Sequence, residues 1–230
     1  MRTFKILAVA IICAVGISGL KAQELKTRLD SAAYVMGSEW GEQFFLNQIE
    51  FNVDAFYAGL KDGYTANKIR IQEPQKSEVR KAFDEYVQKK QQEKSERESR
   101  FNKEVAKSIL EQNRQDKKIK ETASGLQYQV ITEGKGKKPI AADKVKVHYV
   151  GTLFNGTVFD SSRSRNQPAV FGLTQVIPGW TEGLQLMTEG STYKFWIPAE
   201  LGYGERSVGN IPAGSLLIFE VELIKINPED

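Results

Sequence analysis

The sequence has almost no side chains suited to covalent catalysis or metal binding. Its 230 residues include one cysteine, Cys13, and one histidine, His148. Cys13 lies in an apolar run near the N-terminus, so we expect neither a disulfide framework nor a thiol nucleophile in the rest of the chain. A single histidine cannot form a cluster of metal ligands, and no triad pattern surrounds His148. The sequence therefore predicts no metal and no cofactor.

Long apolar runs are also scarce, and the one at the N-terminus is typical of a secretory signal peptide. A basic start up to Lys5 precedes the apolar run Ile6–Ile17, and small or mixed residues continue to Ala22. The run is shorter than the roughly 20 residues that span a bilayer, which disfavours a membrane anchor. We expect cleavage after Ala22 and an exported chain without stable membrane insertion. The periplasm is the leading location, with the cell surface or secretion as alternatives.

An excess of charge of one sign is absent once the signal peptide is removed. The full chain has 32 basic and 29 acidic residues, a net charge of +3. Cleavage would remove Arg2, Lys5 and Lys21 and leave a net charge near zero. The stretch Gly134-Lys135-Gly136-Lys137 lacks the spacing of a phosphate-binding loop and is interpreted as a basic turn. We therefore do not expect nucleic acid as a partner.

Two amphipathic helices are expected at the start of the mature chain. From Leu25 to Leu46, apolar residues recur at spacings of three and four, and a shorter helix is predicted from Val53 to Tyr64. Two such helices are too small to form a core of their own. They should pack against the next helix or a second copy of the chain.

A very long helix is predicted after Pro74, because no glycine or proline occurs between it and Thr122. About fifty helical residues would extend about 70 Å. Its middle, Gln88–Arg100, contains no apolar side chain and should not bury itself. A helical connector is the favoured interpretation, with disorder or a hinge around Gln91–Ser99 as the alternative.

After Thr122 the sequence changes to short runs typical of β-strands. In the last run, Leu217–Leu223, apolar and polar residues alternate, which predicts a sheet with one covered face. The cover is predicted to be a helix over Pro178–Met187, and Asn155-Gly156 favours a two-residue hairpin. This is an α+β arrangement. The other expected strands are Leu126–Thr132, Val145–Leu153, Val158–Ser161 and Thr192–Ile197.

Several motifs in this half, matched in order and spacing, resemble FKBP-type prolyl isomerases over Thr122–Ile226. They are Val147-His148-Tyr149-Val150-Gly151, the stretch Gly156–Ser162, the stretch Val176–Trp180, Tyr203-Gly204, Ile211-Pro212 and Leu217-Ile218-Phe219. The helical front half resembles, more weakly, the dimerisation region of secreted macrophage-infectivity-potentiator-like members. Two departures are Ala169, where many members have an aromatic residue, and the absence of histidine from 205–210.

The resemblance implies a pocket for proline with Trp180 as its floor. It assigns the hydroxyl of Tyr203 and the backbone N–H of Ile177 as donors to substrate carbonyls. Asp160 would be the polar group at the edge, although it can equally hold the turn that follows it. The implied catalytic residues are Tyr149, Phe159, Asp160 and Tyr203. The implied substrate-binding residues are Phe171, Val176, Ile177, Trp180, Ile211 and Phe219.

Four segments are therefore expected: a signal peptide (1–22), a helical dimerisation domain (23–72), a long connecting helix (73–121) and an isomerase domain (122–230). The expected activity is peptidyl-prolyl cis/trans isomerase, or rotamase, that assists folding of exported proteins, with chaperone activity. The resemblance also implies a homodimer, polypeptide clients and binding of macrolide inhibitors. A holdase or adhesion-type protein with incidental isomerase activity, and a structural module with an inactive pocket, are the alternatives.

Overall fold

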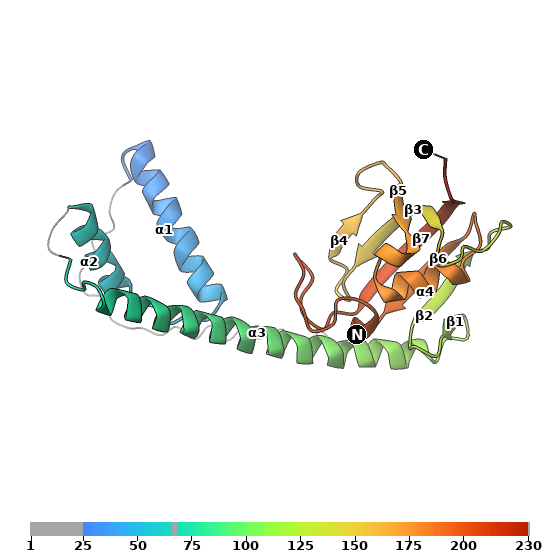
Figure 1. Ribbon diagram of the computed structural model, residues 1–230, viewed down its shortest axis with the longest axis horizontal. Coiled ribbons are helices and arrows are strands. Elements are labelled where there is room, and N and C mark those ends of the chain that lie inside the picture. Colours follow the sequence, from blue (N-terminus) through green and yellow to red (C-terminus); the bar gives the residue numbers. More distant parts are fainter. Residues whose placement is uncertain (1–24, 66–68, 230) are drawn as a thin grey trace, which may run out of the picture. The chain divides into compact units, whose positions relative to one another are not determined.

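The computed structural model describes residues 25–65 and 69–229, so the predicted signal peptide lies outside the described residues. The chain divides into two compact units, Met1–Val53 and Asp54–Asp230. Within the described residues, three α-helices are followed by an antiparallel sheet, with a fourth α-helix inserted between two of its strands, as Figure 1 shows. Among the helices in the described ranges, none is long and apolar enough to cross a membrane.

The first unit contains α1 (Arg28–Leu46), which begins with a capping box. The Thr27 hydroxyl accepts a hydrogen bond from the Asp30 N–H (3.1 Å), and the Asp30 carboxylate accepts one from the Thr27 N–H (2.8 Å). These bonds fix the start of the helix three residues after the predicted one. No α1 side chain is buried, and Leu29 and Phe45 are 82% and 81% exposed.

The second unit opens with α2 (Val53–Tyr64), as predicted, followed by the long α3 (Gln75–Asn113). With 39 residues, α3 is about 58 Å long, shorter than expected. The helix ends at Asn113, and in the turn that follows Asp116 accepts a hydrogen bond from the Lys118 N–H at 2.9 Å. The chain then forms β1 (Ile119–Glu121), a strand that the sequence did not predict.

The seven-stranded sheet follows the order β1-β2-β6-β7-β3-β4, with β5 paired to β3, and all pairs are antiparallel. Four predicted strands correspond to β2, β3, β4 and β6, and the last run extends further than predicted, as β7. The unpredicted β5 is a short strand at one edge. The bounds are β2 (Gln127–Thr132), β3 (Lys144–Thr152), β4 (Val158–Ser161), β5 (Ala169–Gly172), β6 (Thr192–Ile197) and β7 (Leu217–Ile226).

One face of the sheet is covered by α4 (Pro178–Leu186), as Figure 1 shows. Trp180 and Leu184 of α4 are buried against this face, together with Met187, which caps the helix. The alternating residues Leu217, Phe219, Val221 and Leu223 of β7 are buried there too, so the predicted covered face is confirmed. Two 3₁₀ helices, η1 (Leu173–Gln175) and η2 (Ala199–Leu201), lead into α4 and out of β6.

The opposite face of the sheet packs against the last turns of α3. Trp196 of β6 and Ile218 of β7 are cross-strand partners that point away from α4, because side chains alternate along a strand. They form a second cluster with buried Leu216 and with Ala106 of α3. The end of α3 is thus part of the same folded body as the sheet.

The β3–β4 hairpin is one residue longer than the two-residue turn that Asn155-Gly156 favours. The Leu153 N–H donates to the Thr157 carbonyl (2.9 Å), which leaves three residues in the loop. Gly156 has φ +85°, the left-handed conformation expected of the last residue in such a loop. The predicted two-residue turn was therefore wrong, but the hairpin forms where the dipeptide placed it.

Candidate active site

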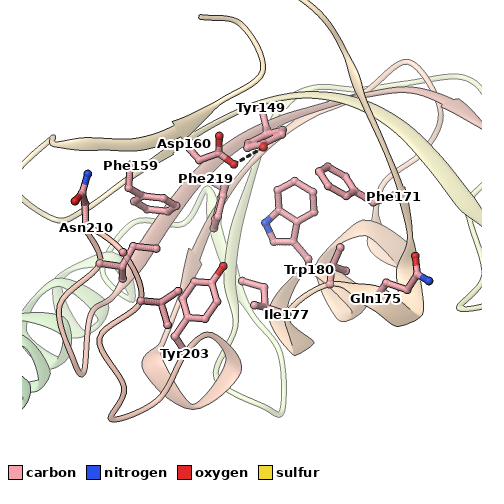
Figure 2. A pocket seen from close by; sticks show the side chains of 14 residues that line it. Tyr149, Phe159, Asp160, Phe171, Gln175, Ile177, Trp180, Tyr203, Asn210 and Phe219 are labelled. Carbon is pink, nitrogen blue, oxygen red and sulfur yellow. Dashed lines mark hydrogen bonds between the residues drawn. The ribbon is translucent and has the colours of Figure 1, made fainter. Parts of the chain in front are cut away.

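The candidate site is a cavity of about 720 Å³ between α4, β3, β4, β5 and the segment that precedes β7. All ten residues singled out from the sequence line it. Four more lining residues were not predicted: Gln175, Val208, Gly209 and Asn210. Figure 2 shows the side chains converging from these elements. The structure therefore brings together every predicted site residue.

Trp180, in the first turn of α4, is enclosed by an aromatic cage. Its ring makes edge-to-face contacts with Tyr149 (5.1 Å, 88°), Phe171 (5.5 Å, 89°) and Phe219 (5.1 Å, 76°). Such pairs add about 0.5–1.5 kcal/mol beyond burial. The indole Nε1 is buried without a hydrogen-bond partner among the described residues, and Figure 2 shows it directed towards the cavity. Trp180 thus forms a rigid, apolar floor.

The opposite wall depends on a close approach to β3 at Gly151. Phe159 and Phe219 pack edge to face at 5.4 Å beside this glycine. A Cβ at position 151 would lie 2.7 Å from both rings, closer than any ordinary contact. A glycine at this position is what allows the two rings to form the wall.

The polar edge of the cavity is a network of three side chains. The Tyr149 hydroxyl donates a hydrogen bond to the Asp160 carboxylate, and the Arg165 guanidinium donates to Asp160 (2.6 Å) and to the Tyr149 oxygen (3.0 Å). Partial burial disfavours ionisation of Asp160, but the bonds from Arg165 and Tyr149 outweigh it and lower its pKa. Burial, and then the bond to Asp160, raise the pKa of Tyr149. Asp160 is therefore a charged acceptor and Tyr149 a neutral donor.

Asp160 was interpreted either as the polar group at the pocket edge or as a group that holds the turn after it, and the geometry is compatible with both. The turn after it is held largely by Ser161, whose hydroxyl accepts from the Ser164 N–H at 3.1 Å. The backbone of Ser161 also contributes, as the smallest of the causes, to the lowered pKa of Asp160. Arg165, which sequence reasoning missed, is the main partner of Asp160. The available sequence signal for this pair was the position of the arginine, five residues after the aspartate in a predicted turn.

Besides the Trp180 indole, two predicted hydrogen-bond donors at the cavity have no protein partner among the described residues. One is the N–H of Ile177, whose own carbonyl accepts from the N–H groups of Trp180 (2.9 Å) and Thr181 (3.1 Å) at the start of α4. The other is the hydroxyl of Tyr203, a 38% exposed side chain. In Figure 2 the Tyr203 hydroxyl points into the cavity towards Trp180. A ligand with two carbonyl groups can occupy both donors.

The unpredicted lining residues belong mainly to a tight loop. Val208 and Ile211 exchange two backbone hydrogen bonds of 2.9 Å around Gly209, whose φ is +55°. The predicted rim residue Ile211 is 7% exposed and joins the main core. His148 lies outside the cavity lining, with its Nδ1 3.0 Å from the Ser162 hydroxyl.

The ionisable side chains that line the cavity are Tyr149, Asp160 and Tyr203, and Tyr149 and Asp160 are hydrogen-bonded to each other. Among residues 25–65 and 69–229, no group of three or more His, Cys, Asp or Glu side chains has the geometry of a metal site. What the cavity offers is an apolar enclosure with the free N–H of Ile177 and the free hydroxyl of Tyr203. It can bind a compact apolar ring flanked by carbonyl groups.

Comparison with protein families gives two matches, one to the helical part of the chain with the first strands and one to the rest of the sheet. Residues 135–224 match the FKBP-type peptidyl-prolyl cis-trans isomerase family, and residues 29–130 match the domain amino terminal to such isomerases. Thus the helical and the sheet regions both resemble parts of one family.

Individual proteins match over nearly the same span. The chain is 39% identical over 206 residues to the outer membrane protein MIP of Legionella longbeachae, covering 89% of this chain and 88% of that protein. It is 38% identical to the FKBP-type isomerase FkpA of Aeromonas hydrophila, covering 88% and 78%. The crystal structure of FkpA from Escherichia coli superimposes with a TM-score of 0.71 at 34% identity, covering 89% of this chain and 99% of that one.

Proposed function

Because the chain belongs to the FKBP-type peptidyl-prolyl cis/trans isomerases, we propose that the cavity over Trp180 is where it isomerises prolyl bonds. The observation that carries the proposal is the convergence of an aromatic cage and two free donors in one cavity. Tyr149, Phe159, Asp160 and Tyr203 are proposed as catalytic residues. Phe171, Val176, Ile177, Trp180, Ile211 and Phe219 are proposed to hold the substrate.

An apolar cavity is sufficient for this reaction. The barrier to rotation about a prolyl bond, about 20 kcal/mol, is the loss of amide resonance. The planar amide is more charge-separated than the twisted one, so transfer from water into an apolar cavity disfavours the planar forms. Preferential binding of the twisted form then accelerates rotation in both directions. No nucleophile, acid, base or metal takes part.

The two free donors define how the substrate is held. We propose that the proline ring lies on Trp180, and that the Ile177 N–H and the Tyr203 hydroxyl bond to substrate carbonyls on either side of the rotating amide, not to the carbonyl of that amide. The carbonyl of the bond before proline then remains free to rotate. The charged Asp160, held by Arg165, fixes Tyr149 as a rigid wall. The same enclosure and donors are proposed to accept a macrolide inhibitor.

The proposed role of the N-terminal helices is to pair two chains and hold clients. Large apolar side chains are exposed on α1 and α2, including Leu29 (82%), Met36 (65%) and Leu60 (59%), and a second copy can cover them. We propose the functional divisions 23–72 for dimerisation, 73–121 for connection and 122–230 for catalysis. Unfolded or proline-containing polypeptides are the proposed clients, with chaperone activity beside isomerisation.

Export is part of the proposed function. The basic start and apolar run of residues 1–22 support a signal peptide, and one relative is named an outer membrane protein. The proposed location is the periplasm or the cell surface.

Substitution of pocket residues in the full-length chain tests the proposal. Phe159→Ala and Tyr203→Ala should each strongly reduce isomerisation of a short prolyl peptide, and Val158→Ala, next to Phe159 but 56% exposed and outside the cavity, should not. Normal turnover by either pocket variant would refute the catalytic assignment. If these variants lose peptide turnover but still suppress aggregation of an unfolded client, the holding activity is separate from the cavity.

A further inference from the structure

The segment between η2 and β7, residues 202–216, is called the pocket loop here because it lines much of the cavity. It contributes Tyr203, Val208, Gly209, Asn210 and Ile211. Three of its glycines, Gly204, Gly209 and Gly214, have φ of +62°, +55° and +69°. Glycine-rich backbone has many alternative conformations and loses much entropy when ordered. The pocket loop therefore needs support from outside itself.

That support comes from α3, through polar side chains at the end of the stretch Gln88–Arg100 and just after it. The Ser99 hydroxyl donates to the Glu205 carboxylate (2.6 Å), which also pairs with Lys103. The Asn102 amide donates to the Ala213 carbonyl (2.8 Å), a buried bond. Ser99 and Asn102 are only 3% and 6% exposed, although both are polar.

The helix and the loop approach each other closely at one glycine. A Cβ at Gly214 would lie 2.7–2.9 Å from the hydroxyl, carbonyl and Cα of Ser99. In Figure 1 the orange-red segment before β7 lies against the light-green part of α3. Backbone contact at this distance fixes the position of the loop against the helix.

The contacts with α3 lie on both sides of the lining residues Val208–Ile211. Glu205 is two residues after Tyr203, and Ala213 is two residues after Ile211. The base of the loop is closed by the Gly214 N–H, which donates to the Gly204 carbonyl at 2.9 Å. Anchoring the two stems of a closed loop limits where its tip can lie. The contacts with α3 therefore restrict the two stems of the loop that carries Tyr203.

We propose that Ser99 and Asn102 of α3 are positioning residues for isomerisation, which hold the pocket loop in the conformation that binds substrate. They touch the loop, not the substrate. The inference rests on the proposed catalytic cavity. It makes the last part of α3 a component of the active site and not a passive spacer.

The test uses the full-length chain with Ser99→Ala, Asn102→Leu and the double variant. Asn102→Leu keeps the volume but removes the donor to Ala213. Each lost bond should lower the fraction of competent loop, and therefore kcat/KM for a prolyl tetrapeptide, by about 3- to 10-fold. The matched control is Glu104→Ala, an exposed position on the same helix, which should leave kcat/KM unchanged.

Amide hydrogen exchange separates positioning from general destabilisation. In the variants, exchange at Gly204, Ile211 and Gly214 should accelerate, with β3 and β7 still protected. Acceleration throughout the sheet would mean that the contacts support the whole fold, and would overturn the proposal. Ser99→Ala alone, the milder change, keeps the test valid if the double variant does not fold.

Phe159→Ala, measured beside the α3 variants, distinguishes failure of the positioning role from failure of the catalytic cavity. If Phe159→Ala abolishes turnover and both α3 variants have normal kcat/KM and loop exchange, the positioning role is refuted and the catalytic cavity stands. If Phe159→Ala is fully active, the catalytic cavity is refuted, and the positioning role falls with it.

Discussion

Gly151→Ala tests the pocket wall most directly. The added Cβ would lie 2.7 Å from Phe159 and from Phe219, whereas an ordinary carbon contact is about 3.4 Å or more. Both contacts must therefore lengthen by about 0.7 Å, through movement of the two rings or of the β3 backbone. Phe219 is 5% exposed and packed between Trp180, Tyr149 and Phe159, so it has little room to move. Overpacking of this kind typically costs about 1–3 kcal/mol.

The same shift should reduce catalysis, because the displaced rings form the wall that encloses the prolyl ring. We expect kcat/KM for a prolyl peptide to fall by about 10-fold, since sub-ångström misplacement at a reacting centre is costly. Urea denaturation followed by circular dichroism measures the stability change. The control is Gly59→Ala in α2, where a Cβ meets nothing within 4 Å. This substitution should stabilise the chain slightly, because alanine is favoured over glycine inside a helix. Unchanged stability and activity in Gly151→Ala would refute this account of the wall.

Three further predictions concern the Asp160–Arg165 pair, the Tyr203 hydroxyl and the exposed apolar residues of α1 and α2. Because the pKa of Asp160 is lowered, its stabilising bonds are complete above the unfolded pKa of about 3.9 and are lost as pH falls through the folded value. In Arg165→Met, the loss of folding stability that accompanies protonation of Asp160 should begin at higher pH. Thermal unfolding between about pH 2 and pH 6 measures it. Tyr203→Phe should weaken binding of a prolyl peptide by about 10-fold in calorimetry without unfolding the chain. Leu29→Glu with Leu60→Glu should yield monomers in sedimentation, whereas Ile140→Glu, also exposed, should not. A monomeric parent chain would contradict the dimer.

The strands of the sheet were predictable where alternation is strong, and α3 was not predictable at its end. Residues 114–121 contain no glycine or proline, so local preference favours continued helix. Packing of Ile119 beside Trp196 and pairing of β1 with β2 decide the outcome instead. Such long-range contacts leave no local pattern. For the same reason β5, four residues at an edge, has no clear signal of its own.

The apolar part of the site was predictable from the family motifs, and its polar supports were not. Arg165 reaches Asp160 because of the turn between them, which the sequence does not specify in detail. Ser99 and Asn102 lie at or next to a stretch without apolar residues, which predicts a solvated helix. Their burial depends on a loop more than a hundred residues away. Polar positioning residues on a polar helix are therefore the class that pattern analysis misses.

The scarcity of histidine and cysteine leads to a final prediction, on pH dependence. If rotation needs no proton transfer, kcat/KM should be constant over the range in which the pocket groups keep their charge. The pKa of Asp160 is lowered, so it stays ionised as pH rises, and the pKa of Tyr149 is raised, so it stays protonated well above neutrality. We expect a flat profile between about pH 6 and pH 9, measured on a tetrapeptide by NMR exchange. A bell-shaped profile with limbs inside this range would require an acid and a base, and would overturn the mechanism based on an apolar cavity and two donors.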